Sequence, residues 1–255
     1  MDINENLIER EAASCQTCGR QFSAAVFRHP LNASRIVSRQ LHCEPCIETE
    51  KQRMATAEAT RRAERAEEEM RAAWERICPD EFRTRLEGGK TDEARLEREQ
   101  PQLREILAHP LGSRGLILRG PTGAAKTRCM FRLLRRYFCA SPRPRIIAMS
   151  AGRFDREARD AAGTFTLTKW FERLAHADVF FLDDLGKGRW TEATAGQFWE
   201  LVDDRTKHDR PIFITTNLTG ETLAESLGLQ RDIAEPLVRR LRENCEMATL
   251  TRSKS

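Results

Sequence analysis

The stretch GLILRGPTGAAKT, residues 115–127, decides the fold. It opens with a short apolar run, passes through a turn that carries two glycines, and ends on a Lys-Thr pair that begins a helix-like segment. Glycines let successive backbone N–H groups curl round phosphate oxygens, and the N-terminus of the following helix adds its positive dipole. A strand, a turn of this kind and a helix in this order predict a P-loop nucleotide-binding domain.

Two side chains of the loop carry the predicted chemistry. Lys126 is expected to reach the β- and γ-phosphates of ATP, and the Thr127 hydroxyl is expected to ligate Mg²⁺. Ala125 stands where the usual pattern has Gly, and we expect helical φ there, which alanine adopts at little cost. The alternative, a glycine-rich turn that binds nothing, is disfavoured because strand, loop and helix are all in place. The residues predicted to hold the nucleotide are Gly120, Pro121, Thr122, Gly123, Ala124, Ala125, Lys126, Thr127 and Asp183.

Further apolar runs follow the loop, at residues 146–149, 179–182 and 212–215. Continuous apolar runs without alternation are what a parallel strand buried on both faces requires. Helix-like stretches lie near 126–139, 166–176, 192–208 and 221–228, and a last run, Met247 to Leu250, could add an edge strand. The pattern predicts an α/β fold with a parallel sheet flanked by helices. Together with the loop, this order resembles a P-loop NTPase of the AAA+ type. We expect no C-terminal helical lid, because few residues follow Arg240.

Polar side chains end two of these strands. Open α/β sheets bind ligands at the carboxyl ends of their strands. Asp183 is predicted to hold Mg²⁺, through water, and Asp184 is predicted to polarise the attacking water at the position where most AAA+ ATPases have Glu. Asp is one methylene shorter, so hydrolysis is expected to be slow or partner-dependent. The Asn217 amide is predicted to contact the γ-phosphate and the attacking water. The competing interpretation is of surface acids and an ordinary turn start.

A basic run, Leu237 to Arg242, follows. An arginine presented to a neighbouring subunit would stabilise transition-state charge on its γ-phosphate. Arg240 is favoured for this role over Arg239. The alternative is a basic helix face.

The N-terminal region carries two CxxC pairs. Each pair can place two thiolates on one ion, and two pairs complete a tetrahedral zinc site. The spacing between the pairs leaves room for His42 or His29 as a substitute ligand. Four unrelated core cysteines or a redox pair are the alternatives, and no βαβ pattern surrounds either pair. The predicted zinc ligands are Cys15, Cys18, Cys43 and Cys46; Cys78, Cys129, Cys139 and Cys245 are interpreted as packing residues.

Composition divides the chain and limits its partners. We predict a zinc-binding module at 1–47, a charged helix at 48–77, a linker with one short helix at 78–110 and an AAA+ ATPase domain at 111–255. The net charge of +4 is too small to identify a nucleic-acid binder. No apolar run approaches the roughly 20 residues that span a bilayer, and the acidic start lacks the order of a secretory signal. We expect a cytoplasmic protein with no membrane partner.

Several short runs carry a resemblance over residues 78–252. They are Cys78 to Phe82, Arg119 to Gly123, Leu182 to Gly186, Asp204-Arg205, Arg210 to Asn217, and Arg240-Leu241. With these runs the chain resembles the bacterial helicase loaders of the DnaC/DnaI group and the related IstB transposition helpers. In such loaders an arginine near the end reads the nucleotide state; Arg252 is the only well-placed candidate, and the Gly expected before it is absent.

The resemblance implies an ATPase that assembles through its ATPase domain, binds single-stranded DNA and remodels a replicative DNA helicase. It also implies that the N-terminal region docks on the helicase. Two alternatives stay open: a transposition helper that polymerises on duplex DNA, and an ATP-gated adaptor that hydrolyses slowly. The adaptor stays among the alternatives because Asp184, with its shorter side chain, predicts slow hydrolysis.

Overall fold

The computed structural model describes residues 8–30, 32–110, 112, 114–140, 142–187, 190–218, 222 and 231–251. The chain forms two compact units, Met1–Met70 and Arg71–Ser255. The predicted helix at 221–228 and Arg252 lie outside the described residues.

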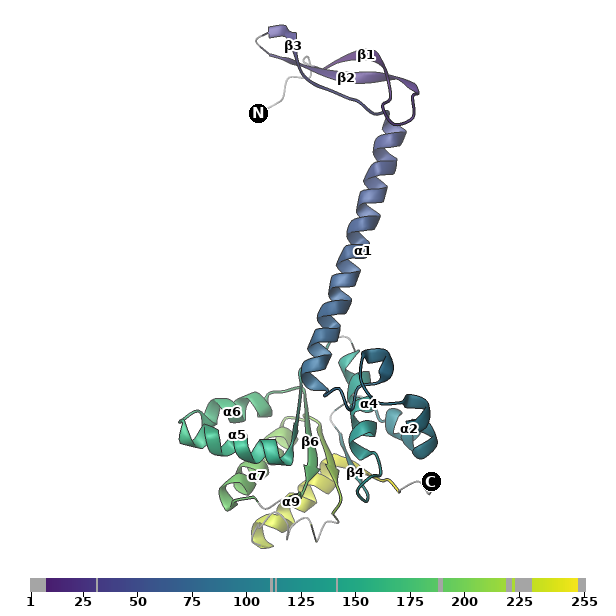
Figure 1. The fold of residues 1–255 in the computed structure, drawn as a ribbon. Helices are drawn as coiled ribbons and strands as arrows, with labels where there is room; N and C mark the ends of the chain where they lie inside the picture. The colour runs from purple at the N-terminus through teal and green to yellow at the C-terminus, as the bar shows by residue number, and fades with distance from the viewer. Residues whose placement is uncertain are drawn as a thin grey trace. The chain divides into compact units, whose positions relative to one another are not determined.

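The first unit holds an antiparallel sheet of strands β1 (Ile8–Ser14), β2 (Gln21–His29) and β3 (Asn32–Arg39), in that order (Figure 1). Ala24 and Val26 of the central strand are fully buried. Arg28 bridges to β1, with its Nε 2.6 Å from a Glu9 carboxylate oxygen and its Nη2 2.7 Å from Glu11. This sheet is absent from the sequence prediction, because charged residues that pair across strands hide the alternation of a strand.

Helix α1 (Glu44–Ile77) begins in the first unit and ends in the second. Pro45 occupies its first turn, where a missing N–H is harmless, and no glycine interrupts it. An ion pair joins Glu58 to Arg62, four residues apart, as expected on a solvated helix face. Trp74 in its last turns is buried within the second unit and packs on Phe138, with ring centroids 5.3 Å apart.

The second unit is built on a five-stranded parallel sheet of order β5-β6-β7-β4-β8. Its strands are β4 (Gly115–Arg119), β5 (Ile146–Ser150), β6 (Val179–Leu185), β7 (Ile212–Thr216) and β8 (Cys245–Thr249). All its ladders are parallel, and β8 pairs with β4 at the edge. The predicted parallel α/β fold is therefore confirmed, edge strand included.

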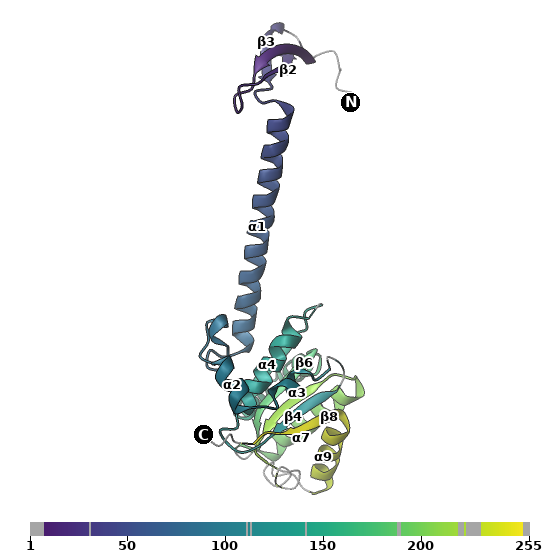
Figure 2. The ribbon, with the colours of Figure 1, turned by 90° about the vertical axis from the view of Figure 1, so that its right-hand side faces the viewer.

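Helices cover both faces of this sheet (Figures 1 and 2). On one face Phe180, Leu182 and Ile214 belong to a core that includes residues of α5, α6, α7 and α9. On the other face Phe181 and Phe213 meet Phe131 and Tyr137 of α4. The helices are α4 (Lys126–Phe138), α5 (Ala151–Gly163), α6 (Leu167–Ala175), α7 (Glu192–Lys207) and α9 (Arg231–Asn244).

The segment 78–110, for which the sequence predicts a linker with one short helix, contains more structure. It forms the 3-10 turn η2 (Arg85–Glu87) and helices α2 (Glu93–Glu99) and α3 (Leu103–Leu107). Leu96, Leu103 and Ile106 are buried, and Glu87 pairs with Arg135 of α4 at 2.6 Å. Elements this short give too little periodicity to be predicted. None of the helices in the described part of the chain is both long and apolar enough to span a bilayer.

Candidate nucleotide site and cysteine cluster

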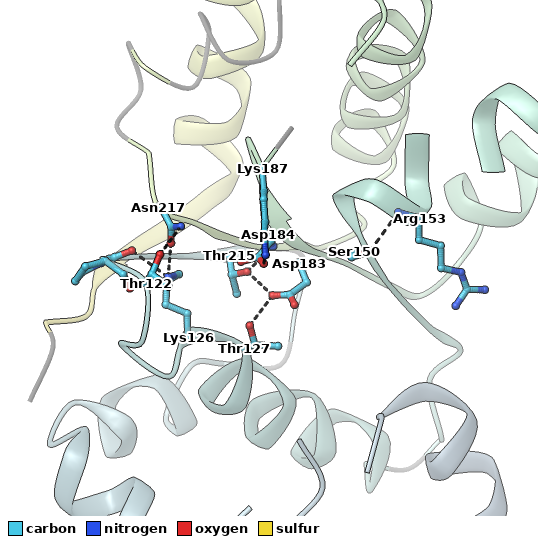
Figure 3. A network of polar contacts seen from close by, with 12 residues as sticks. Thr122, Lys126, Thr127, Ser150, Arg153, Asp183, Asp184, Lys187, Thr215 and Asn217 are labelled. Atoms are coloured by element: carbon cyan, nitrogen blue, oxygen red, sulfur yellow. Dashed lines mark hydrogen bonds and ion pairs between the residues drawn. The ribbon is translucent and has the colours of Figure 1, made fainter. Parts of the chain in front are cut away.

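The loop between β4 and α4 has the backbone of a phosphate cradle (Figure 3). Gly123 has φ 85°, and a Cβ at Gly120 would lie 2.3 Å from the Leu250 carbonyl oxygen. Ala125 caps α4 with φ 53° and ψ 21°, in the left-handed region. The expectation of helical φ at Ala125 is therefore wrong, and the methyl group there is strained by about 1–2 kcal/mol.

The Lys126 ammonium closes this loop from inside. Its Nζ donates to the Gly120 and Pro121 carbonyl oxygens, each at 3.0 Å, and to Asn217 Oδ1 at 2.5 Å. The side chain is only 6% exposed, and burial lowers the pKa of Lys126 against the opposing effect of Asp184 and Asp183. Asn217 in turn donates from Nδ2 to Thr122 Oγ1 at 3.3 Å. The parallel sheet thus brings the predicted lysine and amide together at the ends of β4 and β7.

The Asp183 carboxylate lies at the end of β6, facing the start of α4. Its Oδ1 accepts hydrogen bonds from Thr127 Oγ1 at 2.8 Å and from Thr215 Oγ1. Burial raises the pKa of Asp183, the two hydroxyls oppose that rise, and the neighbouring Asp184 adds to it. A half-buried carboxylate beside a hydroxyl is a set of hard oxygen donors, which suits Mg²⁺.

Asp184 occupies a bulge in β6. The ladder with β7 shifts register between Leu182 and Leu185, and Asp184 has φ 57°. Its N–H donates to Thr215 Oγ1 at 2.9 Å, and its Oδ2 lies 3.2 Å from Lys187 Nζ. Figure 3 shows Lys187 reaching back along the strand end to this carboxylate. The predicted water-orienting group therefore lies beside Asp183 but has different partners.

Arg240 lies elsewhere, on α9. Its Nη2 is 2.6 Å from Asp203 Oδ1 of α7, and Asp203 also pairs with Lys207 at 2.6 Å. Arg239 is 72% exposed and lies 3.8 Å from Glu243. The chain by itself does not bring either arginine to the phosphate loop through any contact among the described residues.

A basic cavity of about 240 Å³, missed by the sequence reasoning, lies beside the first turn of α4. Its wall includes Arg128, which directly follows Thr127 in α4. The other lining residues come from η2, α2 and the turn between them: Arg85, Lys90, Thr91, Asp92, Arg95, Leu96 and Glu99. These residues carry no recognisable motif, so only their shared position in the fold reveals them.

The four N-terminal cysteines gather into one cluster. The sulfur atoms of Cys15, Cys18, Cys43 and Cys46 all lie within 4.8 Å of one another. The Cys18 and Cys43 sulfurs are 3.7 Å apart, close to the edge of about 3.8 Å that Zn–S bonds of 2.3 Å give a tetrahedron. His42 is not part of the cluster, since its Nδ1 is hydrogen-bonded to Thr17 Oγ1 at 2.9 Å. The cluster fits a zinc module.

Backbone donors surround this cluster as well. The Cys43 N–H points at Cys15 Sγ at 3.3 Å and is the main cause that lowers the pKa of Cys15 to about 5. Gly19, with φ 71°, closes the first turn by donating to the Cys15 carbonyl at 2.9 Å. The first cysteine pair thus lies in the turn between β1 and β2, and the second lies at the start of α1.

The fold and the phosphate loop together define an ATPase of the AAA+ class. Residues 98–253 match the family model of the IstB-like ATP binding proteins, which is more than half of the chain. The chain belongs to this family, and its nucleotide is ATP.

Several solved structures are similar to part of this chain. The crystal structure of DnaI matches with a TM-score of 0.51 at 19% identity, covering 69% of this chain and 95% of that one. The DnaC helicase loader matches with a TM-score of 0.48 at 19% identity, over 59% and 86% of the two chains. AMPPCP-bound DnaA from Aquifex aeolicus matches with a TM-score of 0.48 at 17% identity, over 58% of this chain and 44% of its own. This chain thus spans less than half the length of that DnaA. No curated protein sequence matches it.

Proposed function

We propose that the chain is an ATP-driven loader that assembles on single-stranded DNA and remodels a replicative DNA helicase. The observation that supports it most is the set of contacts that joins Lys126, Asn217, Thr127 and Asp183 across the sheet. In this role it works in the cytoplasm, and the division into 1–47, 48–77, 78–110 and 111–255 separates docking from ATP chemistry.

Each residue of the phosphate site would have its own role in binding or hydrolysis. Lys126 would exchange its carbonyl partners for the β- and γ-phosphate oxygens, with backbone N–H groups of residues 122–127 holding the remaining oxygens. Thr127 and Asp183 would hold Mg²⁺, which neutralises developing phosphate charge. Asp184 would accept a hydrogen bond from the attacking water, and Asn217 would orient that water against the γ-phosphate.

Arg240 would complete this site from a neighbouring subunit. A cation added to the γ-phosphate in the transition state stabilises charge that one chain leaves open. To act in this way the arginine must exchange Asp203 for phosphate when subunits meet. Turnover should therefore rise with protein concentration.

The cysteine cluster would hold one Zn²⁺ through Cys15, Cys18, Cys43 and Cys46. Zinc with four thiolates is a closed, structural site that supplies folding free energy and no open position for chemistry. We assign the small sheet around it to docking on the helicase.

Binding and hydrolysis are separated by two variants. Lys126→Ala should abolish ATP binding, measured by titration calorimetry, whereas Asp184→Asn should keep binding and lose turnover. Lys169→Ala, an exposed lysine of α6, is the matched control and should change neither. An Asp184→Asn chain that hydrolyses ATP like the parent would remove Asp184 from the proposed role.

The second candidate function, a transposition helper on duplex DNA, is favoured by the IstB-like family match. Affinity for single-stranded and duplex DNA of equal length, with and without ATP, discriminates the two. Preference for the single strand, stronger with ATP and falling steeply with salt, supports the loader. Equal or tighter binding of duplex supports the helper.

A further inference from the structure

The bulge at the end of β6 holds Asp184 in an unusual conformation. A left-handed φ of 57° is uncommon for a residue with a side chain, and strain of this kind persists only where surrounding contacts enforce it. Here the contacts are on both sides: the Asp184 N–H donates to Thr215 Oγ1, and its carbonyl oxygen accepts from the Lys187 N–H at 3.1 Å. Gly186, with φ 88°, makes this short turn.

The turn brings a cation onto the Asp184 carboxylate. Lys187 Nζ lies 3.2 Å from Oδ2, and the lysine side chain is 77% exposed while that of Asp184 is 34% exposed. The other polar groups of the site have partners of their own: Thr127 and Thr215 donate to Asp183, and Lys126 donates to Asn217.

A carboxylate that orients water must accept a hydrogen bond from that water. An ammonium group on the same oxygen atom competes for that bond. We propose that Lys187 is a positioning residue that restrains Asp184 in the resting chain, so that ATP turnover stays low until this ion pair opens. The inference rests on the proposed role of Asp184 in hydrolysis.

The exposure of Lys187 limits the size of the effect. Exposed ion pairs are weak and are screened by salt, which corresponds here to a change in rate of about two- to five-fold. The restraint therefore sets a basal rate that a modest perturbation, such as an anionic partner drawing Lys187 away, can raise.

The test compares steady-state ATP turnover of the full-length parent with Lys187→Ala, Lys187→Arg and the control Lys169→Ala. Lys187→Ala should raise kcat about two- to five-fold at low salt with KM unchanged, and the gain should shrink in about 0.5 M KCl as the pair is screened. Lys187→Arg keeps the pair and should behave like the parent, as should Lys169→Ala. An unchanged kcat, or a fall in kcat with a rise in KM, would overturn the proposal, the latter by making Lys187 a nucleotide contact.

A second measurement does not depend on turnover. The acylation rate of the Lys187 amine, measured by mass spectrometry in the nucleotide-free chain, should rise about two-fold in Asp184→Asn relative to that of Lys169, because the ion pair holds the amine on the Asp184 carboxylate and away from the reagent. No change in that rate would mean that the pair is not held in solution. A parent chain with no turnover under any condition would instead contradict the proposed function, and the acylation result would stand apart from it.

Discussion

Lys126 and Asn217 are 91 residues apart in the sequence, yet Lys126 Nζ lies 2.5 Å from Asn217 Oδ1. Cys18 and Cys43 are only 25 residues apart, and their sulfur atoms are separated by 3.7 Å. The first contact lies at the end of a sheet whose core includes Phe180, Phe181 and Phe213, all fully buried. The second lies in a unit whose described strand residues are mostly exposed, although Ala24 and Val26 are fully buried. Apolar burial organises the phosphate site before any ligand binds, whereas we expect the cysteine cluster to depend on the metal ion that its thiolates would hold.

The largest expected effect tests that dependence. Cys43→Ser should lose the bound zinc and unfold β1–β3, because structural zinc supplies about 10–16 kcal/mol of apparent binding free energy in small domains. ATP affinity should be retained, since the second unit has its own core. Zinc content by mass spectrometry and amide hydrogen exchange over residues 8–50 measure the loss.

Cys139 is exposed, so its interpretation as a packing residue is wrong, whereas Cys78, Cys129 and Cys245 are buried. Cys139→Ser is therefore the control and should leave zinc content at one ion per chain. Protected β1–β3 amides in a zinc-free Cys43→Ser chain would show that the small sheet is stable without metal, and the contrast between the two units would disappear.

The strands of the larger unit were predictable because both faces of each strand are covered, so the apolar runs are continuous. Helix α5 was not predicted, since its buried face is made mainly of Ala151, Ala158 and Ala161, whose small side chains give little periodic signal. The sheet of the first unit was not predicted, because its strands have few apolar residues. Ion pairs such as Arg28 with Glu11 lie where an alternating apolar pattern would be expected.

The phosphate site was likewise predicted only in part from the sequence. The sequence predicted Lys126 in the loop at a helix start and Asp183 and Asn217 at strand ends. Hydrogen bonds join Lys126 to Asn217 and Thr127 to Asp183. The sequence did not predict the left-handed backbone of Ala125 and Asp184, because neither residue type indicates that conformation. Nor could it foresee that Arg240 pairs with Asp203, because that contact depends on how α7 and α9 pack.

The next largest effect concerns Arg240, which pairs with Asp203 and makes no contact with the phosphate loop of its own chain among the described residues. Arg240→Ala should keep ATP binding and reduce turnover by about 10³-fold, the share typical of an arginine supplied by a neighbour. Mixing Arg240→Ala with Lys126→Ala chains should restore part of the activity, since each supplies what the other lacks at a shared interface. Turnover is followed by phosphate release at several protein concentrations.

Arg239→Ala serves as the matched variant. If it loses activity and Arg240→Ala does not, the exposed arginine is the catalytic one and Arg240 only joins α9 to Asp203. A mixture that stays inactive while both variants assemble would mean that neither arginine acts across subunits.

A smaller effect probes what holds the larger unit together beyond apolar burial. Arg205 is fully buried, and its guanidinium donates to the carbonyl oxygens of Leu174, Ala177 and Pro211 at 2.7–2.8 Å. Burial lowers the pKa of Arg205 to about 9, and the cation still dominates at neutral pH. Arg205→Lys cannot reach all these acceptors and should destabilise the unit by about 3 kcal/mol, measured by urea unfolding. Arg159→Lys, on the exposed face of α5, should change stability by less than about 0.5 kcal/mol. Equal effects of the two variants would contradict a structural role for Arg205.

The smallest expected effect is a gain in stability at the phosphate loop itself. Ala125 has φ 53°, a conformation that glycine adopts without strain. Ala125→Gly should relieve about 1–2 kcal/mol of strain and lose about 0.5–1 kcal/mol to the greater freedom of the unfolded chain, for a net stabilisation of about 0.5–1 kcal/mol. The same change at Ala162, an exposed helical position of α5, should destabilise by up to about 1 kcal/mol, because no strain is relieved there. Urea unfolding of the nucleotide-free chain measures both. A gain for Ala125→Gly and a loss for the Ala162 variant would mean that the larger unit enforces a strained loop before ATP binds. The smaller unit, with few buried strand residues, has too small a core to enforce strain of this kind. Two losses of equal size would mean that Ala125 relaxes to helical φ in solution.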